Sequence, residues 1–555
     1  MKYINISESL MWVFLIIGAV AGAAMIGYQV QTDWNDLPRA EQQAVLESQK
    51  IETVAEDFLK NHFSLDASSF QKASVLMSEP LPDTFIEQSY LSESERITYK
   101  DVYLGASIAY YVRFFKPETI EEYDVTIDAF RGTIIDFSQT LPEDALITEV
   151  SENDAIETAR KFVAEKINVE PSTLLVHAKD EKTYPGGIER IITLSRTGSE
   201  LDSKYGKGFV TYLVTVRGSS VVSFLPSFEY PEPYERALEK SGNVGMLVGF
   251  LSLIAWIGII LAALVYMIQA FSSHTAMWKL TLGVVAILGV LSVIDFINQY
   301  PETRAWYDTI DSMSVYWIFA GAFTIFGIVV SSLMFFVPSV AGHTLAVGAY
   351  RERIAPLTNL PSTKDIKVAY RLALIRGYLL GILFLGFTLG LYWIGETYLG
   401  VWYPYGEAMG VMGLSSIVPA FTLMLSFGIM AAITEEITFR LFGILWISSL
   451  TKSTVLGVFV ATVVWAFAHT NGSVLPIWFR GGEVFVGGLL FAYFFMRYNI
   501  LTTIVAHYVH NIIIAGVLLL FTFGIAQIVP VMLIFLMPAI MYLVVELAVS
   551  HRIKS

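Results

Sequence analysis

The sequence of 555 residues contains no cysteine and few charged side chains. The absence of cysteine excludes disulfide bonds, thiolate catalysis and any metal site with a cysteine ligand. Only 15% of the residues are charged, whereas soluble proteins carry about a quarter. Because 54% of the residues are hydrophobic and the mean hydropathy is +0.57, we expect much of the chain to face lipid.

A basic surface is also missing, which argues against nucleic acid as a partner. The net charge of −14 is distributed unevenly along the chain. Between Asp33 and Lys240 there are 37 acidic and 21 basic residues, a net charge of −16, and the remainder of the chain has a net charge of +2. The sequence therefore predicts an acidic soluble segment inserted into a slightly basic membrane protein.

About ten apolar runs approach or reach the length that crosses the ~30 Å hydrocarbon core of a bilayer as a helix. They lie near residues 10–30, 244–270, 277–297, 315–337, 372–394, 412–433, 455–468, 484–496, 500–521 and 528–549. The first run has no basic segment beyond Lys2, so residues 1–32 are predicted to be an uncleaved membrane anchor. The predicted fold class is a polytopic α-helical membrane protein with an inserted soluble α+β domain.

The basic loops predict the orientation in a cell membrane. The connection over residues 338–376 carries six lysines and arginines against two acidic residues, which is typical of a cytoplasmic loop. Alternating the spans from there places the N- and C-termini in the cytoplasm and residues 33–242 outside it. The predicted partners are the lipid bilayer and a membrane protein or peptide.

The soluble segment contains an internal repeat. Glu52–Phe58 aligns with Ile156–Phe162 at an offset of 104 residues, and both copies place apolar residues at helical spacing. Each copy is followed by strand-like alternation, so an α+β domain made of two units, about 45–140 and 150–235, is predicted. The units resemble PepSY modules, which often accompany secreted or membrane proteases, and this resemblance implies a bacterial protein. A domain of another, unknown role stays open.

Ionisable residues interrupt the apolar runs of the second half in one dense cluster. Charged groups inside a span are costly and mark candidate functional sites. Glu436 and Arg440 are four residues apart, so on a helix they lie on one face and can pair. His507 and Asn511 share the same spacing and are expected to point one way.

A predicted hairpin brings two of these motifs to the same depth. The turn near Lys452 lies 16 residues after Glu436 and 17 before His469. In an antiparallel helix pair, both side chains therefore lie about 25 Å from the turn. No Gly-x-Ser-x-Gly motif is present, and Ser415 and Ser416 lack a base at motif spacing.

Three motifs carry a family resemblance: Glu435-Glu436-x-x-x-Arg440, an aromatic residue four positions before His469, and His507-x-x-x-Asn511. Together they resemble the motifs of the CPBP family, which includes the type II CAAX prenyl endopeptidases and bacterial relatives tied to bacteriocin processing or immunity. The resemblance covers about residues 372–520. The sequence departs from it at Trp465, where the family usually has phenylalanine, and either side chain supplies an aromatic wall.

The resemblance assigns residues 372–555 to a catalytic transmembrane bundle and residues 243–371 to accessory helices with a basic loop. It implies an intramembrane endopeptidase that hydrolyses a peptide bond of a membrane-associated protein or peptide. Prenylated substrates are not expected in a bacterium, so the substrate stays open.

The resemblance also implies a role for each motif residue. Glu435 with His469 would activate water, and the Glu436 pair with arginine would orient the site. His507 and Asn511 would donate hydrogen bonds to the developing oxyanion. The predicted catalytic residues are Glu435, Glu436, Arg440, His469, His507 and Asn511.

The need for a metal stays open at this point. The family has been described both as metalloproteases and as glutamate-dependent proteases without a metal. Glu435, His469 and His507 would be the ligands of a Zn²⁺ ion, which favours three protein ligands plus water. The sequence lacks His-Glu-x-x-His, and we favour a mechanism without a cofactor.

Two hypotheses without catalysis also remain. In a membrane scaffold or immunity protein, the Glu–Arg and His–Asn pairs would hold helices together. In an ion-coupled transporter, the same groups would line an ion pathway, although the sequence lacks the inverted repeats typical of transporters. A cavity that joins all three motifs is expected only for the enzyme.

Overall fold

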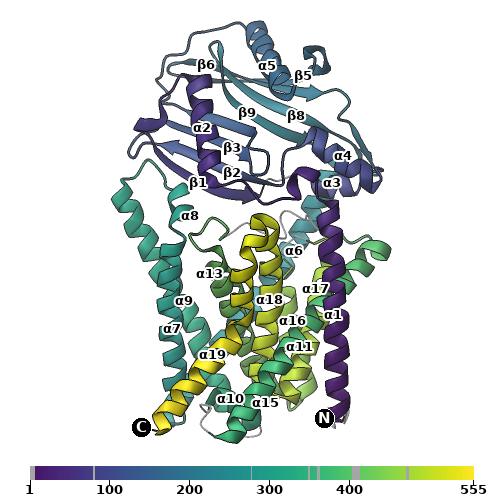
Figure 1. Cartoon of the computed structure of the whole chain (residues 1–555), viewed down its shortest axis with the longest axis vertical. Helices are drawn as coiled ribbons and strands as arrows, with labels where there is room; N and C mark the ends of the chain where they lie inside the picture. The colour runs from purple at the N-terminus through teal and green to yellow at the C-terminus, as the bar shows by residue number, and fades with distance from the viewer. Residues whose placement is uncertain are drawn as a thin grey trace.

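In the computed structural model of the chain, the described residues are 7–78, 82–276, 278–347, 350–358, 363–402, 413–470 and 474–554. A domain built on a β-sheet stands above a bundle of long helices (Figure 1). The domain lies in sequence between α1 (Glu8–Asp36) and α6 (Glu232–Ser272). Both ends of the chain lie at the end of the bundle that is far from the sheet (Figure 1).

Each half of the soluble domain begins with one long helix. These helices are α2 (Ser48–Phe63) and α5 (Glu152–Ile167), and their bounds are related by the 104-residue offset found in the sequence. Both end in a residue with left-handed backbone, Ser64 and Asn168. Each helix buries residues spaced by four, which are Ile51, Ala55 and Leu59 in α2 and Ala155, Ala159 and Val163 in α5.

The two halves share one antiparallel sheet of nine strands. The strands are β1 (Gln71–Ser78), β2 (Ile108–Phe115), β3 (Glu122–Asp128), β4 (Ile134–Thr140), β5 (Leu174–Tyr184), β6 (Gly187–Arg196), β7 (Leu201–Ser203), β8 (Gly206–Arg217) and β9 (Ser220–Glu229). Their order is β1-β2-β3-β4-β9-β8-β6-β5, with β7 beside β8. The last strands of the two halves therefore pair at the centre, where Phe137 is opposite Phe224.

Aromatic side chains fix α2 and α5 on this central pair of strands. Phe58 of α2 lies 4.8 Å from Phe137, and Phe162 of α5 lies 5.5 Å from Phe224, measured between ring centroids. His62 of α2 is 5.6 Å from Phe162. The two helices therefore lie side by side on one face of the sheet. Two further helices of the domain are α3 (Asp83–Glu87) and α4 (Glu93–Tyr103).

Long helices make up the rest of the molecule. They are α7 (Lys279–Asn298), α9 (Met313–Ala346), α11 (Lys364–Ile394), the helical stretch Pro419–Thr451, α16 (Thr454–Phe467), α17 (Ile477–Arg497), α18 (Ile500–Phe523) and α19 (Ile528–Lys554). Two short helices, α8 (Tyr300–Ala305) and α10 (Arg351–Thr358), connect them. Their long apolar stretches favour helices because no water is available in a bilayer to satisfy an open backbone.

Eight helices among the described residues are long and apolar enough to cross a membrane, fewer than the ten or so predicted. One difference is α16, whose 14 residues extend only about 21 Å and fall short of the ~30 Å core. The other is the pair α18 and α19, which a four-residue turn joins into one apolar stretch, Ile500–His551. Length is the physical reason for the first difference. In the second, α18 (24 residues) and α19 (27 residues) are each long enough to cross a bilayer, so the two predicted spans there are counted as one only because they are contiguous.

The soluble domain is attached to the bundle by hydrogen bonds at the β1 side of the sheet. Arg113 of β2 donates to the carbonyls of Ala305 and Tyr307, which follow α7. The backbone N–H of Leu76 in β1 donates to Ser415 Oγ at 2.6 Å. These contacts place residues 413–418, which directly precede the Pro419–Thr451 helix, under the sheet.

The absence of cysteine allows a direct test of the orientation. We expect a membrane-impermeant maleimide to label Leu146→Cys in intact spheroplasts, because Leu146 is 96% exposed in the soluble domain. His551→Cys, at the exposed end of α19, should be labelled only after permeabilisation. The parent chain has no cysteine and serves as the blank. Labelling of His551→Cys alone in intact cells would reverse the predicted topology.

Candidate active site

The two adjacent glutamates lie in a helix that is locally widened. The helical stretch Pro419–Thr451 contains two π-helical segments, η5 (Met424–Met430) and η6 (Glu436–Ile444), separated by α14 (Ala431–Glu435). π-Helical turns occur frequently at functional sites because they re-aim side chains within a helix. Here the transition falls between Glu435 and Glu436 and gives the two carboxylates different surroundings.

Glu436 is fully buried and has two partners. Its Oε1 lies 3.2 Å from Nη1 of Arg440, which is 2% exposed, so the pair expected from the i,i+4 spacing is present. The same oxygen lies 3.0 Å from Nδ1 of His507 on α18. This second partner was not predicted, because it depends on how α18 packs against η6. Glu436 is thus held by a cation and an imidazole.

The side chain of Glu435 is 18% exposed and faces His469. Its Oε2 lies 3.9 Å from Nε2 of His469 and 3.9 Å from Nε2 of His507. These separations exceed a direct hydrogen bond but suit a water molecule that bridges the two groups. The hairpin around Lys452 therefore brings the first two motifs together, as its length predicted, and the third motif joins them.

The indole of Trp465 completes the surroundings of Glu435. Its Nε1–H donates to Oε2 of Glu435 at 2.5 Å, and its ring lies 3.9 Å from the guanidinium carbon of Arg440. From the sequence, this side chain was expected only to supply an aromatic wall. An indole N–H inside an apolar bundle needs an acceptor, and that requirement was the signal for this contact.

A backbone carbonyl determines which nitrogen of His469 carries the proton. Nδ1 of His469 lies 2.8 Å from the carbonyl oxygen of Trp465, which only accepts hydrogen bonds. Nδ1 is therefore the donor, and in the neutral ring Nε2 is left as an acceptor that faces Glu435. This arrangement matches what a proton-accepting histidine requires.

Asn511 lies one helical turn beyond His507 on α18, on the same face as the spacing predicts. Its Nδ2 donates to the carbonyl of Phe427 in η5 at 2.8 Å. An amide nitrogen has two hydrogens, so one remains for a ligand. The contact also anchors α18 to the first π-helical segment.

Other ionisable groups in the bundle lie outside this arrangement. His510 packs against Phe384, with ring centroids 4.7 Å apart, and does not join the three motifs. Arg480 and Glu483 of α17 form an ion pair at 2.8 Å that was not predicted from the sequence. Thr388 of α11 donates to Glu483. This pair ties α17 to α11.

The residues proposed for zinc lie farther apart in this structure than the ligands of a bound zinc ion do. Ligating atoms of a tetrahedral site at ~2.0–2.1 Å from the ion are separated by about 3.3 Å, whereas the two histidines lie 3.9 Å from Glu435 Oε2. That oxygen also accepts the indole N–H of Trp465. Over the described ranges, no group of three or more histidine, aspartate or glutamate residues is arranged to hold a metal.

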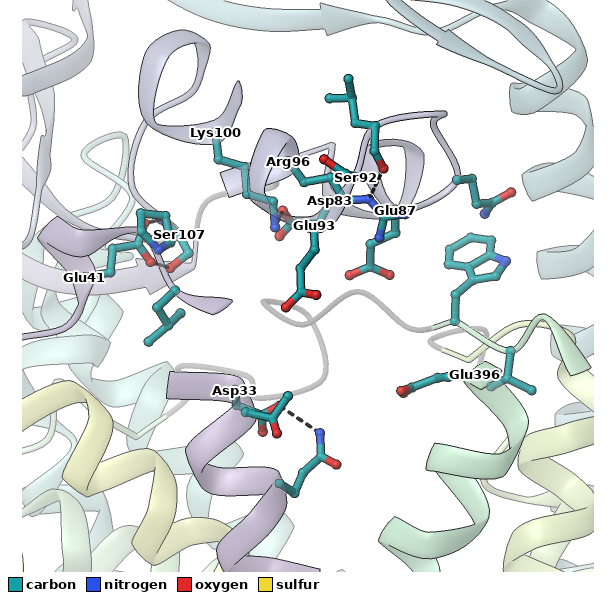
Figure 2. A pocket seen from close by; sticks show the side chains of 18 of the residues that line it. Asp33, Glu41, Asp83, Glu87, Ser92, Glu93, Arg96, Lys100, Ser107 and Glu396 are labelled. Atoms are coloured by element: carbon teal, nitrogen blue, oxygen red, sulfur yellow. Dashed lines mark hydrogen bonds and ion pairs between the residues drawn. The ribbon is translucent and has the colours of Figure 1, made fainter. Parts of the chain in front are cut away.

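A separate cavity of about 700 Å³ lies between the soluble domain and the bundle. Figure 2 shows carboxylates entering it from several elements, among them Asp33 from α1, Glu87 from α3 and Glu396 beyond α11. Burial raises the pKa of Glu87 to about 7. Lys100 neutralises part of this charge through an ion pair with Asp83 at 2.6 Å. The cavity contains none of the predicted catalytic residues.

Comparison with protein families shows what this part of the chain is similar to. Residues 417–513 match the family described as type II CAAX prenyl endopeptidase Rce1-like. This stretch contains all six predicted catalytic residues and excludes α11 and α19, so the match is narrower than the predicted bundle. Residues 417–513 of the chain thus carry a domain similar to the type II CAAX prenyl endopeptidase Rce1-like enzymes.

A curated relative was also found. The chain is 27% identical over 90 residues to the sporulation-killing factor biosynthesis protein SkfC of Bacillus subtilis (strain 168). The aligned part is 16% of this chain and 18% of the relative, so the chain spans less than a fifth of that protein's length. No solved structure gave a significant match.

Proposed function

We propose that this protein is an intramembrane endopeptidase in which Glu435 and His469 activate a water molecule. The observation that carries the proposal is the convergence of three motifs from separate helices on one carboxylate oxygen. Glu435 Oε2 lies 3.9 Å from Nε2 of both His469 and His507, a spacing that suits water between them. Helix packing alone does not require two imidazoles to face one partly exposed carboxylate.

Glu435 is the better candidate for the base than Glu436. Glu436 has no exposed side-chain surface and is held by Arg440 and His507. Glu435 keeps 18% side-chain exposure, so water can reach it. Glu435 therefore takes a proton from water, and Glu436 orients His507.

The reaction follows the usual course of peptide hydrolysis. The water oxygen attacks the carbonyl carbon while its proton moves to Glu435, and the carbonyl oxygen becomes an oxyanion. The remaining N–H of Asn511 and the Nε2–H of the imidazolium form of His507 donate to this oxyanion. The proton then moves to the departing amide nitrogen, the C–N bond breaks, and a carboxylic acid and an amine are released. The acid then loses its proton to the amine or to water. None of these steps requires a metal.

The position of His469 favours cleavage near one membrane surface. The carbonyl of the next residue, Thr470, lies against Gly245 of α6, close enough that a Cβ there would be 2.8 Å from it. Gly245 stands at the start of the apolar part of α6, five residues after Lys240 and on the side of the soluble domain. The scissile bond is therefore expected at the border of the bilayer beneath that domain.

A groove along α6 gives an apolar substrate a path to this position. Its volume is about 530 Å³, and its lining includes Gly249, Phe250 and Ala468, the residue before His469. α6 is mostly exposed along its apolar length, as expected for a helix that contacts lipid. The substrate class that fits is a membrane-embedded peptide, and the two PepSY-like halves of the outer domain would meet its external part.

The function is tested by reconstitution in liposomes with single-span peptides of different sequence. We expect hydrolysis near the domain-side end of the apolar span, identified by mass spectrometry, and loss of that product with His469→Ala. The activity should persist after treatment with a metal chelator. Activity that ceases on chelation and returns with Zn²⁺ would instead assign a metal to Glu435, His469 and His507. Ion flux without hydrolysis would replace the protease by a transporter.

A further inference from the structure

Trp465 touches three of the six predicted catalytic residues. Its Nε1–H donates to Glu435 Oε2 at 2.5 Å, and its carbonyl oxygen accepts from His469 Nδ1 at 2.8 Å. Its ring lies 3.9 Å from the guanidinium carbon of Arg440. The first of these contacts needs an indole, because the phenylalanine usual at this position has no N–H.

We propose that Trp465 is a positioning residue that fixes the Glu435 carboxylate through its indole N–H. The proposal rests on the proposed function. A glutamate side chain has several rotatable bonds, and its two oxygens are equivalent until a donor distinguishes them. The indole donates to Oε2, and this is the same oxygen that lies 3.9 Å from Nε2 of both His469 and His507. One donor therefore determines where the bridging water binds.

The indole is itself held rigidly, so it can impose this geometry. Arg440, which is 2% exposed, lies over one face of its ring, and Phe491 meets the ring edge-on with the centroids 6.5 Å apart. Trp465 is 4% exposed. A buried, stacked indole has little freedom to rotate, whereas Glu435 without it would have no hydrogen-bond partner among the described residues. The tryptophan thus supplies order as well as an apolar wall.

The two glutamates are also distinguished by this contact. Glu436 has a guanidinium 3.2 Å away and an imidazole 3.0 Å away, while Glu435 receives only the neutral indole N–H. A single neutral donor orders a carboxylate without saturating its oxygens, because each oxygen accepts two hydrogen bonds. Glu435 therefore remains able to accept a proton from water.

The test compares Trp465→Phe with wild type in the reconstituted hydrolysis assay. We expect kcat to fall by roughly tenfold or more, since a hydrogen bond to a charged group is worth at least that factor. KM should stay within about twofold, because the side chain of Trp465 is only 4% exposed and acts through Glu435. Trp446→Phe is the matched control. Trp446 stacks on Phe442 within the Pro419–Thr451 stretch, and its side chain makes no hydrogen bond among the described residues. It should retain full activity.

A double-mutant cycle separates positioning from a structural role. In a Glu435→Ala background, Trp465→Phe should cause no further loss of the residual activity, because its target is already absent. A further tenfold loss there, or wild-type kcat in Trp465→Phe, would overturn the proposal. If Trp465→Phe lowers the thermal midpoint, replacement of residue 465 by benzothienylalanine, which keeps the ring shape and lacks N–H, must reproduce the loss of kcat. An inactive wild-type protein would instead refute the proposed function itself.

Discussion

Glu435→Gln is expected to lower the rate of hydrolysis by about 10² or more, which is the usual contribution of a positioned general base. Glutamine has nearly the same size and keeps an oxygen that accepts from the Trp465 indole at the 2.5 Å contact. It cannot take a proton from water. The measurement is kcat on a single-span peptide in liposomes, with the thermal midpoint of each purified variant recorded alongside.

The fold of this variant should be almost unchanged, because a neutral amide costs less to bury than a carboxylate. Glu436→Gln is the informative comparison, since it changes the neighbouring residue by the same atoms but disturbs the contacts with Arg440 and His507. We expect it to alter stability as well as activity. A Glu435→Gln protein that hydrolyses peptide at the wild-type rate would refute the assignment of the base and favour the scaffold hypothesis.

Arg440→Ala is expected to reduce the free energy of unfolding by ~3 kcal/mol or more, because it leaves a fully buried carboxylate without its cation. Arg440 is 2% exposed and Glu436 has no exposed surface, so water cannot replace the guanidinium. The lost packing of Arg440 over Trp465 adds to the effect. Unfolding in mixtures of SDS and mild detergent measures the change.

Arg480→Ala provides a matched control within the same bundle. Arg480 also pairs with a buried glutamate, Glu483, but its side chain is 31% exposed, so solvent can compensate part of the loss. We expect a clearly smaller destabilisation. Combining Arg440→Ala with Glu436→Gln should recover much of the stability, because the buried charge is then removed with its partner. If Arg440→Ala and Arg480→Ala lower the free energy of unfolding equally, the Glu436–Arg440 pair contributes no more to stability than the Arg480–Glu483 pair.

The membrane helices were predicted from the sequence, and so were the ionisable residues that the structure brings close together. Apolar runs predict helices wherever about 20 residues lack charge, because lipid leaves the backbone no other way to satisfy its polar groups. The same cost makes an intramembrane Glu435, Arg440 or His507 conspicuous. The count of spans was less predictable, since α16 is short and α18 continues almost directly into α19.

The internal repeat was also visible in the sequence, and the structure shows how the two repeated halves join into one domain. The 104-residue offset relates α2 to α5, and the two halves meet by pairing β4 with β9. That pairing could not be predicted, because both strands carry the same alternation and either could have remained an edge. Likewise, the bond between Leu76 and Ser415, 339 positions apart, left no local pattern.

The sequence by itself determined that this is a membrane-embedded site built from paired ionisable residues, because desolvation of charge constrains the chain wherever it is buried. Only the tertiary structure decided which partner each group has. The spacing predicted the ion pair between Glu436 and Arg440, because both residues lie on one helix. The contact of His507 with Glu436 and the hydrogen bond from Trp465 to Glu435 each join two different helices. Such contacts depend on the widened turn of η6 and on the rotation of α16 and α18 about their axes. Helical periodicity specifies neither, so the division of roles between the two glutamates came from packing.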